Sequence, residues 1–537
     1  MENGKIAKKY IAIALATILA LGSIAVFYMH GNSPIAAEKE NETETEKITS
    51  GNEMAYEELF ERDRINDIYI EISEADWESM LADPLAEEYK SATIKIGDMT
   101  LENVGFRTKG NLTLKSVASS DSDRYSFRVK LDKYEKGQNL LGLDEFVLNN
   151  MYSDPSYMRE YLSYEALREI GADAPLASYA NVYINGELFG FYLMVEAIDD
   201  SFLERNFGGA DGNLYKQEQG STLQYVEGSN YEKSELKVGS DESKTDLKNF
   251  IQILNEMPEG EKGDIESVLD VDSALRYIAV NTVLGNYDSY NGNLAQNYYL
   301  YGQNGKFTVI PWDYNMSIGG FGGGNNQITI PIDEPVLGVN MESLPLINNL
   351  LAVEEYKERY HGYIQELLNY LENFEERVTQ LASIIRPYVE ADPTKFCTME
   401  QFEASITYSE ESTESTDSTA NTAPQDVDNQ QENSMPPQQI QPQDEQQFQK
   451  PQGMPENLEN GERPEPPQGG MGGGARSGPG AGGRGMMASS TSILNFVRDR
   501  VENIKQQLSG QLPTTGNTTM NGNMQRGNQF NKMNKPQ

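Results

Sequence analysis

A long tract of low complexity interrupts this chain and decides which residues can form a packed core. The tract covers residues 409–490 and is rich in Gln, Pro, Gly, Ser and Met, as in PQGGMGGGARSGPGAGGRG. Such a composition cannot bury enough apolar surface to offset the entropy lost on ordering, so a disordered insert is predicted. Apolar patterning typical of packed structure runs from residue 55 to 408, and we expect one large domain there.

A short amphipathic pattern returns after the insert, in SILNFVRDRVENIKQQL. Its apolar residues recur at helical spacing: Ile493, Phe496, Val497, Val501, Ile504 and Leu508. We expect the last helix of the domain at 491–510, displaced by the insert, and a disordered tail at 511–537. LPTTG in that tail has the form of a sortase signal, but the hydrophobic span and basic residues that such a signal needs do not follow it in this sequence, so wall sorting is not favoured.

The amino terminus carries a topological signal. KIAKKY precedes an apolar run from Ile11 to Met29, and the acidic EKENETETEK follows. The run is close to a bilayer span in length and positive charge stays on the cytoplasmic side. We predict a transmembrane signal anchor at 1–30, an acidic linker at 31–54 and an extracytoplasmic domain. A secretory signal peptide, cleaved near SPIAAE, is the alternative.

Net charge and rare residues exclude several functions. The formal net charge of −40 repels phosphate backbones, so no nucleic acid partner is expected. A single cysteine, Cys397, allows neither an internal disulfide nor a thiolate zinc site, and the chain has only two histidines. Any bound metal should therefore be a hard cation held by carboxylate and amide oxygens.

The first half of the domain mixes strands with a helix. The strand ATIKI, at Ala92–Ile96, carries Lys95, and the strand in YSFRVKLDKY carries Lys130. Next, DPSYMREYLSYEALREIG starts with Asp-Pro, repeats apolar residues at helical spacing and closes with a glycine, which predicts a capped helix over Tyr157–Ile170. This order indicates an α+β fold.

A hairpin and a second helix follow. YANVYINGELFGFYLMVEAID alternates apolar and polar residues around Asn185-Gly186, a strong hairpin signal, and leads to Glu196. The apolar spacing in DVDSALRYIAVNTVLGNYD predicts a helix capped by Asp272. This helix delivers the chain to Asp288.

A second hairpin, NYYLYGQNGKFTVIPWD, sets the geometry of the candidate site. If its Asn-Gly dipeptide forms a two-residue turn, counting back along both strands puts Asn297 opposite Trp312, directly beside Asp313. Asp288 enters from the preceding loop at the same end of the hairpin. The sequence therefore predicts that three oxygen-bearing side chains converge, a set that suits Mg²⁺ or Mn²⁺.

This set matches the needs of phosphoryl transfer from ATP. One carboxylate orients or deprotonates the attacking hydroxyl, a carboxylate with an amide holds the metal, and a lysine neutralises phosphate charge. Protein kinases present these groups in the order strand lysine, helix, hairpin, helix, catalytic loop, short hairpin and metal aspartate. The chain has the same order but lacks HRD, DFG and GxGxxG, which excludes an ordinary kinase.

The residues resemble the spore-coat protein H (CotH) kinase family over about 56–407. The motifs that carry the resemblance occur in the expected order: VGFRTKGNLT, DPSYMRE, VYINGELFGFYLMVEAID, NLYK, NYDSYNGN, NYYLY and IPWDYN. The resemblance implies an atypical, two-lobed kinase-like fold that transfers phosphate from ATP to Ser or Thr of secreted, surface or coat proteins with a divalent metal. By the same resemblance, Asp288 matches the catalytic aspartate, Asp313 the metal aspartate and Lys95 the ATP lysine.

Two departures from the family pattern stand out. The family commonly has a second acid after PWD, where this chain has Asn315, and the loop between Asp288 and NYYLY is longer than in compact members. Either departure could weaken metal binding or alter the site for the acceptor.

Two site assignments have rivals. A strand lysine is usually solvated, and Lys130 is an alternative to Lys95 as the nucleotide lysine. Asn293 has the five-residue spacing from Asp288 typical of ordinary kinase catalytic loops, whereas Asn297 follows from the hairpin register and is favoured as a metal ligand.

Other candidates each have a structural alternative. Arg107, with Lys109, is a candidate for the phosphates, but Arg107 could equally form a structural ion pair. Glu196 is a candidate at the nucleotide hinge or a strand cap. The glycine-rich run Gly319–Asn326 resembles a phosphate cradle only in composition, and a flexible loop like an activation segment is the favoured interpretation.

The main hypothesis is an extracytoplasmic, metal-dependent Ser/Thr kinase tethered to the membrane. Its own Ser- and Thr-rich segment, Ser405–Thr422, is a candidate for autophosphorylation because tethering presents hydroxyls at high effective concentration. The rival hypothesis is a surface binding or adhesion protein that keeps the fold without catalysis.

Overall fold

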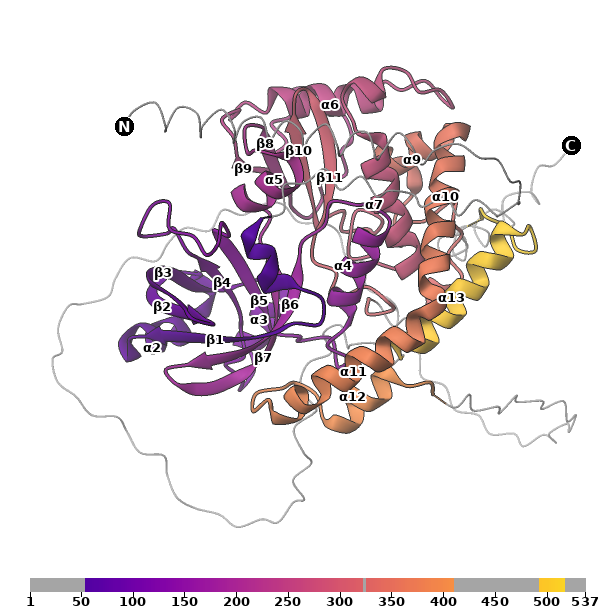
Figure 1. The fold of residues 1–537 in the computed structure, drawn as a ribbon. Helices are drawn as coiled ribbons and strands as arrows, with labels where there is room; N and C mark the ends of the chain where they lie inside the picture. The colour runs from indigo at the N-terminus through magenta and orange to yellow at the C-terminus, as the bar shows by residue number, and fades with distance from the viewer. Residues whose placement is uncertain (1–53, 322–324, 410–491, 517–537) are drawn as a thin grey trace, which may run out of the picture. The chain divides into compact units, whose positions relative to one another are not determined.

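Seven strands close into a barrel in the first part of the described chain (Figure 1). The computed structural model describes residues 54–321, 325–409 and 492–516. The strands follow the order β1-β2-β3-β4-β5-β7-β6, and β1 pairs with β6 in parallel to close the ring. Their bounds are β1 Ile65–Ile72, β2 Lys90–Ile96, β3 Met99–Lys109, β4 Ser126–Lys130, β5 Glu145–Asn149, β6 Ala177–Ile184 and β7 Glu187–Glu196.

Alternating apolar residues fill the barrel. Along β3, for example, Val104 and Phe106 are buried, and Phe106 pairs with Val129 on β4. Phe127 on β4 pairs with Leu148 on β5, and both are buried. Successive side chains of a strand point to opposite faces. Arg107 and Lys109 therefore share the face of β3 that points away from the Phe106 side chain.

A second, four-stranded antiparallel sheet has the order β11-β10-β8-β9. Its strands are β8 Asn213–Gln217, β9 Ser234–Val238, β10 Tyr298–Gln303 and β11 Lys306–Pro311. The turn between β10 and β11 is the two-residue Asn304-Gly305 turn, with Gln303 paired to Lys306. The predicted hairpin register is therefore confirmed, and both turn residues have positive φ, as a type I′ turn requires.

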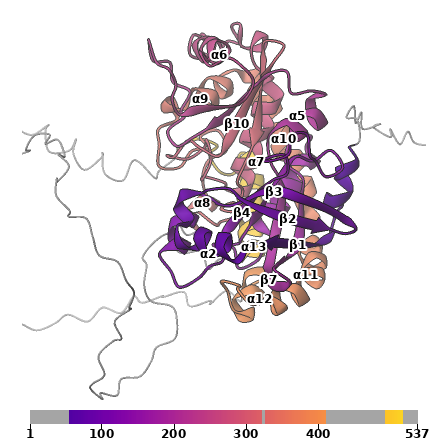
Figure 2. The same cartoon turned by 90° about the vertical axis from the view of Figure 1, so that its left-hand side faces the viewer.

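Helices surround this sheet and one wall of the barrel (Figure 2). The α-helices are α2 Glu74–Ala82, α3 Leu112–Ala118, α4 Arg159–Glu169, α5 Asp200–Phe207, α6 Thr245–Asn255, α7 Val271–Leu284, α8 Asn325–Ile328, α9 Pro345–Ala352, α10 Glu354–Tyr370, α11 Phe374–Ala391, α12 Met399–Ile406 and α13 Ile493–Leu508. The short 3₁₀ helices are η1 Ala55–Phe60, η2 Pro84–Ala86, η3 Ile265–Ser267, η4 Met341–Ser343 and η5 Leu371–Asn373. The central α7 contacts α4, α10, α13 and β11, and nearly all of its residues are buried.

The α+β class predicted from the sequence is confirmed, and so are the helix over most of 157–170 and the hairpin at Asn185-Gly186. The closed barrel was not predicted. One cap was predicted wrongly: Asp270, not Asp272, caps α7, because the Asp270 side chain accepts the hydrogen bond from the Asp272 N–H at 3.1 Å.

The predicted anchor at 1–30, the linker up to residue 53 and the insert from residue 410 to 491 lie outside the described residues. Among the residues that are described, no helix is both long and apolar enough to span a bilayer. Part of the predicted tail is described and is held in place. The Thr514 carbonyl in LPTTG accepts the Asp333 N–H at 2.8 Å, and the Gly516 N–H donates to the Glu334 carboxylate at 2.9 Å.

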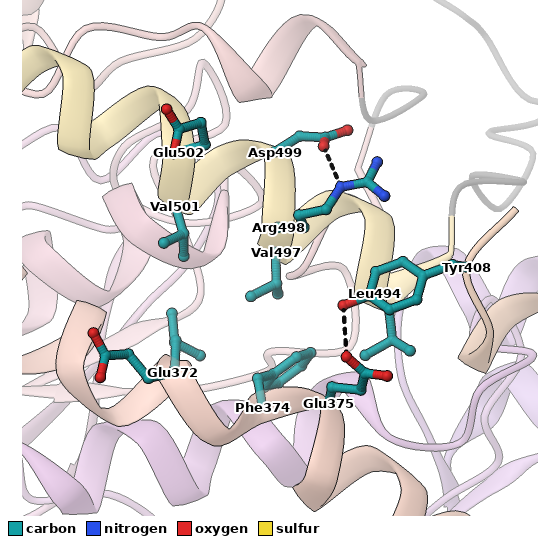
Figure 3. A pocket seen from close by; sticks show the side chains of 11 residues that line it. Glu372, Phe374, Glu375, Tyr408, Leu494, Val497, Arg498, Asp499, Val501 and Glu502 are labelled. Atoms are coloured by element: carbon teal, nitrogen blue, oxygen red, sulfur yellow. Dashed lines mark hydrogen bonds and ion pairs between the residues drawn. The ribbon is translucent and has the colours of Figure 1, made fainter. Parts of the chain in front are cut away.

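A groove lies between α13 and the segment formed by η5 and the start of α11 (Figure 3). Its apolar wall includes Phe374, Leu494 and Val497, and several acids stand around it. Its lining residues come from η5, α11, α13 and Tyr408 and include none of the hairpin of β10 and β11, so this groove is not the site predicted from the sequence.

Candidate active site

Asp288 lies just after α7, in a loop that begins at the left-handed Gly285. The Gln296 side-chain amide donates to the Asp288 carboxylate at 2.7 Å. Burial, together with the nearby charge of Asp313, raises the pKa of Asp288 to about 6, although the hydrogen bond from Gln296 opposes this shift. A carboxylate with a pKa near neutrality is suited to accept a proton at physiological pH.

Asn297 occupies the predicted position at the start of the hairpin. The last recorded pair is Tyr298 with Pro311, so the next step along both strands reaches Asn297 and Trp312. The Asn297 side-chain amide donates to the Asp288 backbone carbonyl at 2.7 Å, which leaves only its amide oxygen as a potential metal ligand. The rival Asn293 is exposed and lies against Gly338 instead.

Asp313 follows β11 in a left-handed backbone conformation, with φ of 59°. Its N–H donates to the Tyr164 hydroxyl at 3.1 Å, which ties this acid to α4. The charge of Asp313 also contributes to the raised pKa of Asp288, so the two carboxyl groups interact electrostatically.

Strained backbone occurs around these acids, as it does at several other places in the described residues. Ala295, Asn297, Asp313 and Ile318 are non-glycine residues with positive φ. This conformation costs on the order of 1–3 kcal/mol per residue and persists only where the surroundings impose it. A β-branched residue such as Ile318 is especially unfavourable there. The strain therefore indicates that the positions of these side chains are fixed by the rest of the fold.

A chain of polar side chains connects the barrel to α4 beside Asp313. Lys109, the last residue of β3, donates to the Asn149 side chain at 2.9 Å, and Asn149 donates to Glu160 at 2.8 Å. The Tyr164 hydroxyl donates to the other Glu160 oxygen at 3.2 Å. The Lys109 ammonium also lies 5.8 Å from the centre of the Trp312 ring, next to Asp313.

The electrostatics of this chain are strongly perturbed. Burial lowers the pKa of Lys109, although the charges of Asp313 and Glu160 oppose the shift. Burial and the Asp313 charge raise the pKa of Glu160 to about 7, against the opposing charge of Lys109. Buried titratable groups that are shifted in this way are typical of functional sites.

A buried amide, Asn281 of α7, supports both acid-bearing loops from behind. Its side-chain oxygen accepts from the Tyr314 hydroxyl at 2.7 Å, next to Asp313, and from Asn286 at 3.3 Å. Its amide nitrogen donates to Asn291 at 3.1 Å, three residues after Asp288. One α7 side chain thus links the loop of Asp288 to that of Asp313.

Lys95 is far from this site. It is exposed on β2, where it pairs with Thr100 on β3, nine positions before Lys109. At about 3.3 Å per residue this separation is roughly 30 Å along the strand. The rival Lys130 is held among carboxylates, at 3.0 Å from Glu145 and 3.8 Å from Asp199. These positions argue against Lys95 as the nucleotide lysine and in favour of Lys109.

The two other predicted nucleotide ligands take structural partners. Arg107 forms an ion pair with Glu87 and lies over the Tyr89 ring at 5.0 Å. Glu196 is fully buried and receives four hydrogen bonds, two of them from Arg205 at 2.6 and 3.0 Å. The structure thus favours the alternatives that the sequence left open for both, an ion pair for Arg107 and a structural contact for Glu196.

Sequence reasoning missed Gln296 and Glu160 and undervalued Lys109. Lys109 and Glu160 stand inside VGFRTKG and DPSYMRE, two of the motifs that carry the family resemblance. The family motifs therefore pointed to both residues. Their link through Asn149, however, depends on how β3 and α4 pack. Gln296 had no signal beyond its place beside Asn297.

Among the described residues, no group of three or more His, Cys, Asp or Glu side chains is arranged to hold a metal ion. The predicted ligand set does not need one, because it consists of two carboxylates and an amide. Mg²⁺ is commonly bound by one or two carboxylates together with substrate phosphates and water. The donor chemistry of Asp288, Asn297 and Asp313 therefore fits such a metal.

Comparison with known proteins gives the family. The CotH kinase protein family model matches residues 106–418, and the chain belongs to this family. The match includes Lys109 and begins after Lys95.

Three relatives match in sequence. The chain is 29% identical to the inner spore coat protein H of Bacillus subtilis over 272 residues, which cover 49% of this chain and 73% of that protein. It is 22% identical to the invasin CotH2 of Rhizopus delemar over 274 residues, 46% of this chain and 45% of that protein. It is 36% identical to an inner spore coat protein H-like protein of Bacillus subtilis over 75 residues, 14% of this chain and 23% of that protein.

Proposed function

We propose that this chain is a metal-dependent atypical kinase that transfers phosphate from ATP to Ser or Thr hydroxyls of proteins. The observation that carries the proposal is the position of Lys109, 5.8 Å from the Trp312 ring next to Asp313 and linked through Asn149 to Glu160, together with the electrostatic interaction of Asp313 with both Lys109 and Asp288. Phosphoryl transfer depends on positioning and on neutralising phosphate charge, and these residues supply the required charges. The barrel, which carries Lys109, and the part that carries the acids would act as the two lobes of a kinase-like fold.

Asp288 is the residue that orients and deprotonates the acceptor hydroxyl. Its raised pKa, about 6, places its proton affinity near that needed by a general base at neutral pH. Gln296 fixes the orientation of its carboxylate through the 2.7 Å hydrogen bond. Its other carboxylate oxygen is the one that would accept the proton of the hydroxyl.

Asp313 and the amide oxygen of Asn297 would hold Mg²⁺ or Mn²⁺. When bound, such an ion neutralises the charge that develops on the transferred phosphate. The strained conformations at Asn297 and Asp313 keep both side chains at the end of the hairpin, so little ordering is needed on binding. The half-buried Asn315 stands where the family commonly has a second acid, which leaves Asp313 with more of the charge to supply.

Lys109 takes the role that the sequence assigned to Lys95. Glu160 does not contact it directly, since Asn149 lies between them with hydrogen bonds of 2.9 and 2.8 Å. Lys109 therefore keeps donor capacity for phosphate oxygens while its position stays fixed. An anionic phosphate beside Lys109 would favour the charged ammonium and reverse the effect of burial on its pKa.

The acceptor proteins belong to a cell surface or coat in this proposal. Support comes from the names of the relatives, an inner spore coat protein and an invasin. Residues 1–30 would anchor the protein in the membrane with the domain outside, or would be removed by signal cleavage. Of the segment proposed for autophosphorylation, Ser405 is buried in α12, whereas Thr407 is exposed.

The test measures phosphate added to the full chain itself. Intact mass is recorded after incubation with ATP and Mn²⁺ or Mg²⁺, with and without EDTA, for the wild type and for Asp313→Ala. We expect mass increases of single phosphates on the wild type, none with EDTA and none on the variant. Equal phosphate on wild type and variant would show that the chemistry does not use this site.

The rival, a surface binding protein without catalysis, makes a different prediction. It expects no thermal shift with ATP and metal, and no change on Asp288→Asn. The kinase proposal expects a rise in Tm with ATP and Mn²⁺ that Lys109→Met reduces, because bound ligand stabilises only the folded state.

A further inference from the structure

The helix α13 follows the long insert in sequence but lies directly behind the candidate active site. It contacts α7, α8, α11 and α12 (Figures 1 and 2). Ile493, Phe496 and Ile504 on its inner face are fully buried in the main core. α13 therefore packs against α7, the helix that leads to Asp288.

The Phe496 ring is wedged between two glycines. A Cβ atom built on Gly285 would lie 2.6 Å from the Phe496 Cζ atom, and one built on Gly319 would lie 2.7 Å from its Cδ2 atom. Real Cβ atoms do not approach so closely, so the ring occupies the space that a side chain would need at both positions. Both glycines also have positive φ, 62° and 74°.

These two glycines border the two acids. Gly285 ends α7, three residues before Asp288, and Gly319 lies six residues after Asp313. The two loops are joined beside the ring by the strained Ile318, whose N–H donates to the Leu284 carbonyl at 2.7 Å. One aromatic side chain therefore packs against the backbone of both loops at the place where they meet.

Arg500, one turn further along α13, fixes how this helix is placed. Its side chain is fully buried, and its recorded partners are backbone carbonyls: Thr282 of α7 at 3.0 Å, Ile328 at 2.8 Å and Ile330 at 2.7 Å. A buried guanidinium without these acceptors would be costly, so α13 cannot slide along α7 without losing them. Thr282 lies in the last turn of α7, just before Gly285.

We propose that α13 is a positioning element for catalysis, with Phe496 holding the loops of Asp288 and Asp313 at their working separation. The inference rests on the proposed function and adds a residue that touches neither metal nor nucleotide. Because Phe496 sets the relation between the two acids, its loss should lower kcat. Lys109 lies on the barrel side and keeps its proposed contact with the phosphates, so KM for ATP should change much less than kcat.

The variant Phe496→Leu shortens the ring and leaves α13 apolar. Its matched control is Phe374→Leu, the same change at a residue that is 6% exposed and lines the groove beside α13, which Phe496 does not line (Figure 3). Both changes open a cavity against α13, but only the first touches the two loops. The kinetics of the full chain are measured with ATP and Mn²⁺ at a temperature well below both Tm values.

We expect Phe496→Leu to lower kcat by about 10- to 100-fold with KM for ATP within about 3-fold, since misplacement of reacting groups by about 1 Å costs on this order. Phe374→Leu should keep kcat within about 2-fold, because the shorter side chain there leaves both acid loops untouched. Equal losses in both leucine variants, or no loss in Phe496→Leu, would overturn the inference while the proposed function stands. A wild type that transfers no phosphate would overturn the proposed function, and the role of Phe496 in catalysis with it.

Discussion

The regions around Asp288 and around Glu196 each hold an acid away from solvent, but the two carboxylates differ in their hydrogen bonds and in the charges next to them. Glu196 is fully buried, and its two oxygens receive hydrogen bonds from Tyr56, Arg205 and the Leu176 N–H. The Asp288 carboxylate accepts from the neutral Gln296 amide at 2.7 Å, has the Asn297 amide as a second hydrogen-bonding neighbour, and faces the like charge of Asp313. Burial and the Asp313 charge raise the pKa of the Asp288 carboxyl to about 6.

The difference separates an acid that holds the fold together from one that is ready for chemistry. A saturated buried carboxylate is stable as an anion and has no lone pair to offer a ligand. A carboxylate that is buried beside another acid is destabilised in its charged form. A cation or a proton donor that binds next to it removes this destabilisation. Substitutions at the two regions should therefore affect different quantities.

The largest expected effect is on activity, at Asp313. Asp313→Asn removes the charge that would hold the metal and should lower phosphate transfer at least about 10³-fold, measured as kcat/KM with ATP and Mn²⁺. Asp173→Asn is the control, because burial raises the pKa of Asp173 to about 6, as it does for Asp288, but the charged neighbours of Asp173 are Arg205 and Asp270. If the control loses as much activity, the effect of Asp313→Asn is not specific to the proposed site.

The next effect separates the two candidate lysines. Lys109→Met should lower kcat/KM for ATP by about 10²-fold or more, because the cation proposed to bind the phosphates is lost. Lys95→Met removes an exposed charge on β2 and should leave kcat/KM within about 2-fold. The reverse order of effects would restore Lys95 as the nucleotide lysine.

At Glu196 the expected loss is in stability. Glu196→Ala leaves the largely buried Arg205 without its carboxylate and should lower the free energy of unfolding by about 3–5 kcal/mol in urea titrations. Activity per folded molecule should change little. For comparison, Glu88→Ala breaks the pair with Lys90, in which Glu88 is exposed, and should hardly alter stability. A loss of activity without a loss of stability at Glu196 would favour the hinge role.

The smallest effect is a gain in stability at Asp288. Its folded pKa, about 6, lies above the ordinary value of 3.8, so the folded state binds the proton more tightly and loses stability as pH rises from about 4 to 6. Asp288→Asn removes this loss and should raise stability by roughly 1–3 kcal/mol at pH 8, and little at pH 4. Tm is measured in EDTA at both values. An equal gain at both would mean that the carboxyl pKa is not raised.

The local part of the site could be predicted from sequence, and the part made by packing could not. An Asn-Gly turn fixes the register of a hairpin, so the position of Asn297 next to Trp312 followed from counting residues. The partner of Asp313 on the barrel side depends on which end of β3 meets α4. Lys95 and Lys109 lie on neighbouring strands of the same sheet, and only the closed barrel determines that the second one faces the acids.

The same limit explains the other differences. Glu196 and Arg107 stand in motifs typical of the family, but their partners, Arg205 and Glu87, come from segments whose packing has no local pattern. The apolar spacing of α13 was visible, whereas its contact with Gly285 and Gly319 requires the tertiary structure.

The contact of Phe496 with both loops also has a consequence for biosynthesis. Asn495, its neighbour in α13, donates a hydrogen bond to Ser409, so the two ends of the intervening segment meet. Chains are made from the amino end and their parts fold in that order. A nascent chain contains Asp288 and Asp313 long before α13 has left the ribosome. The loops of these two acids therefore lack their contact with the Phe496 ring until synthesis of α13 is complete.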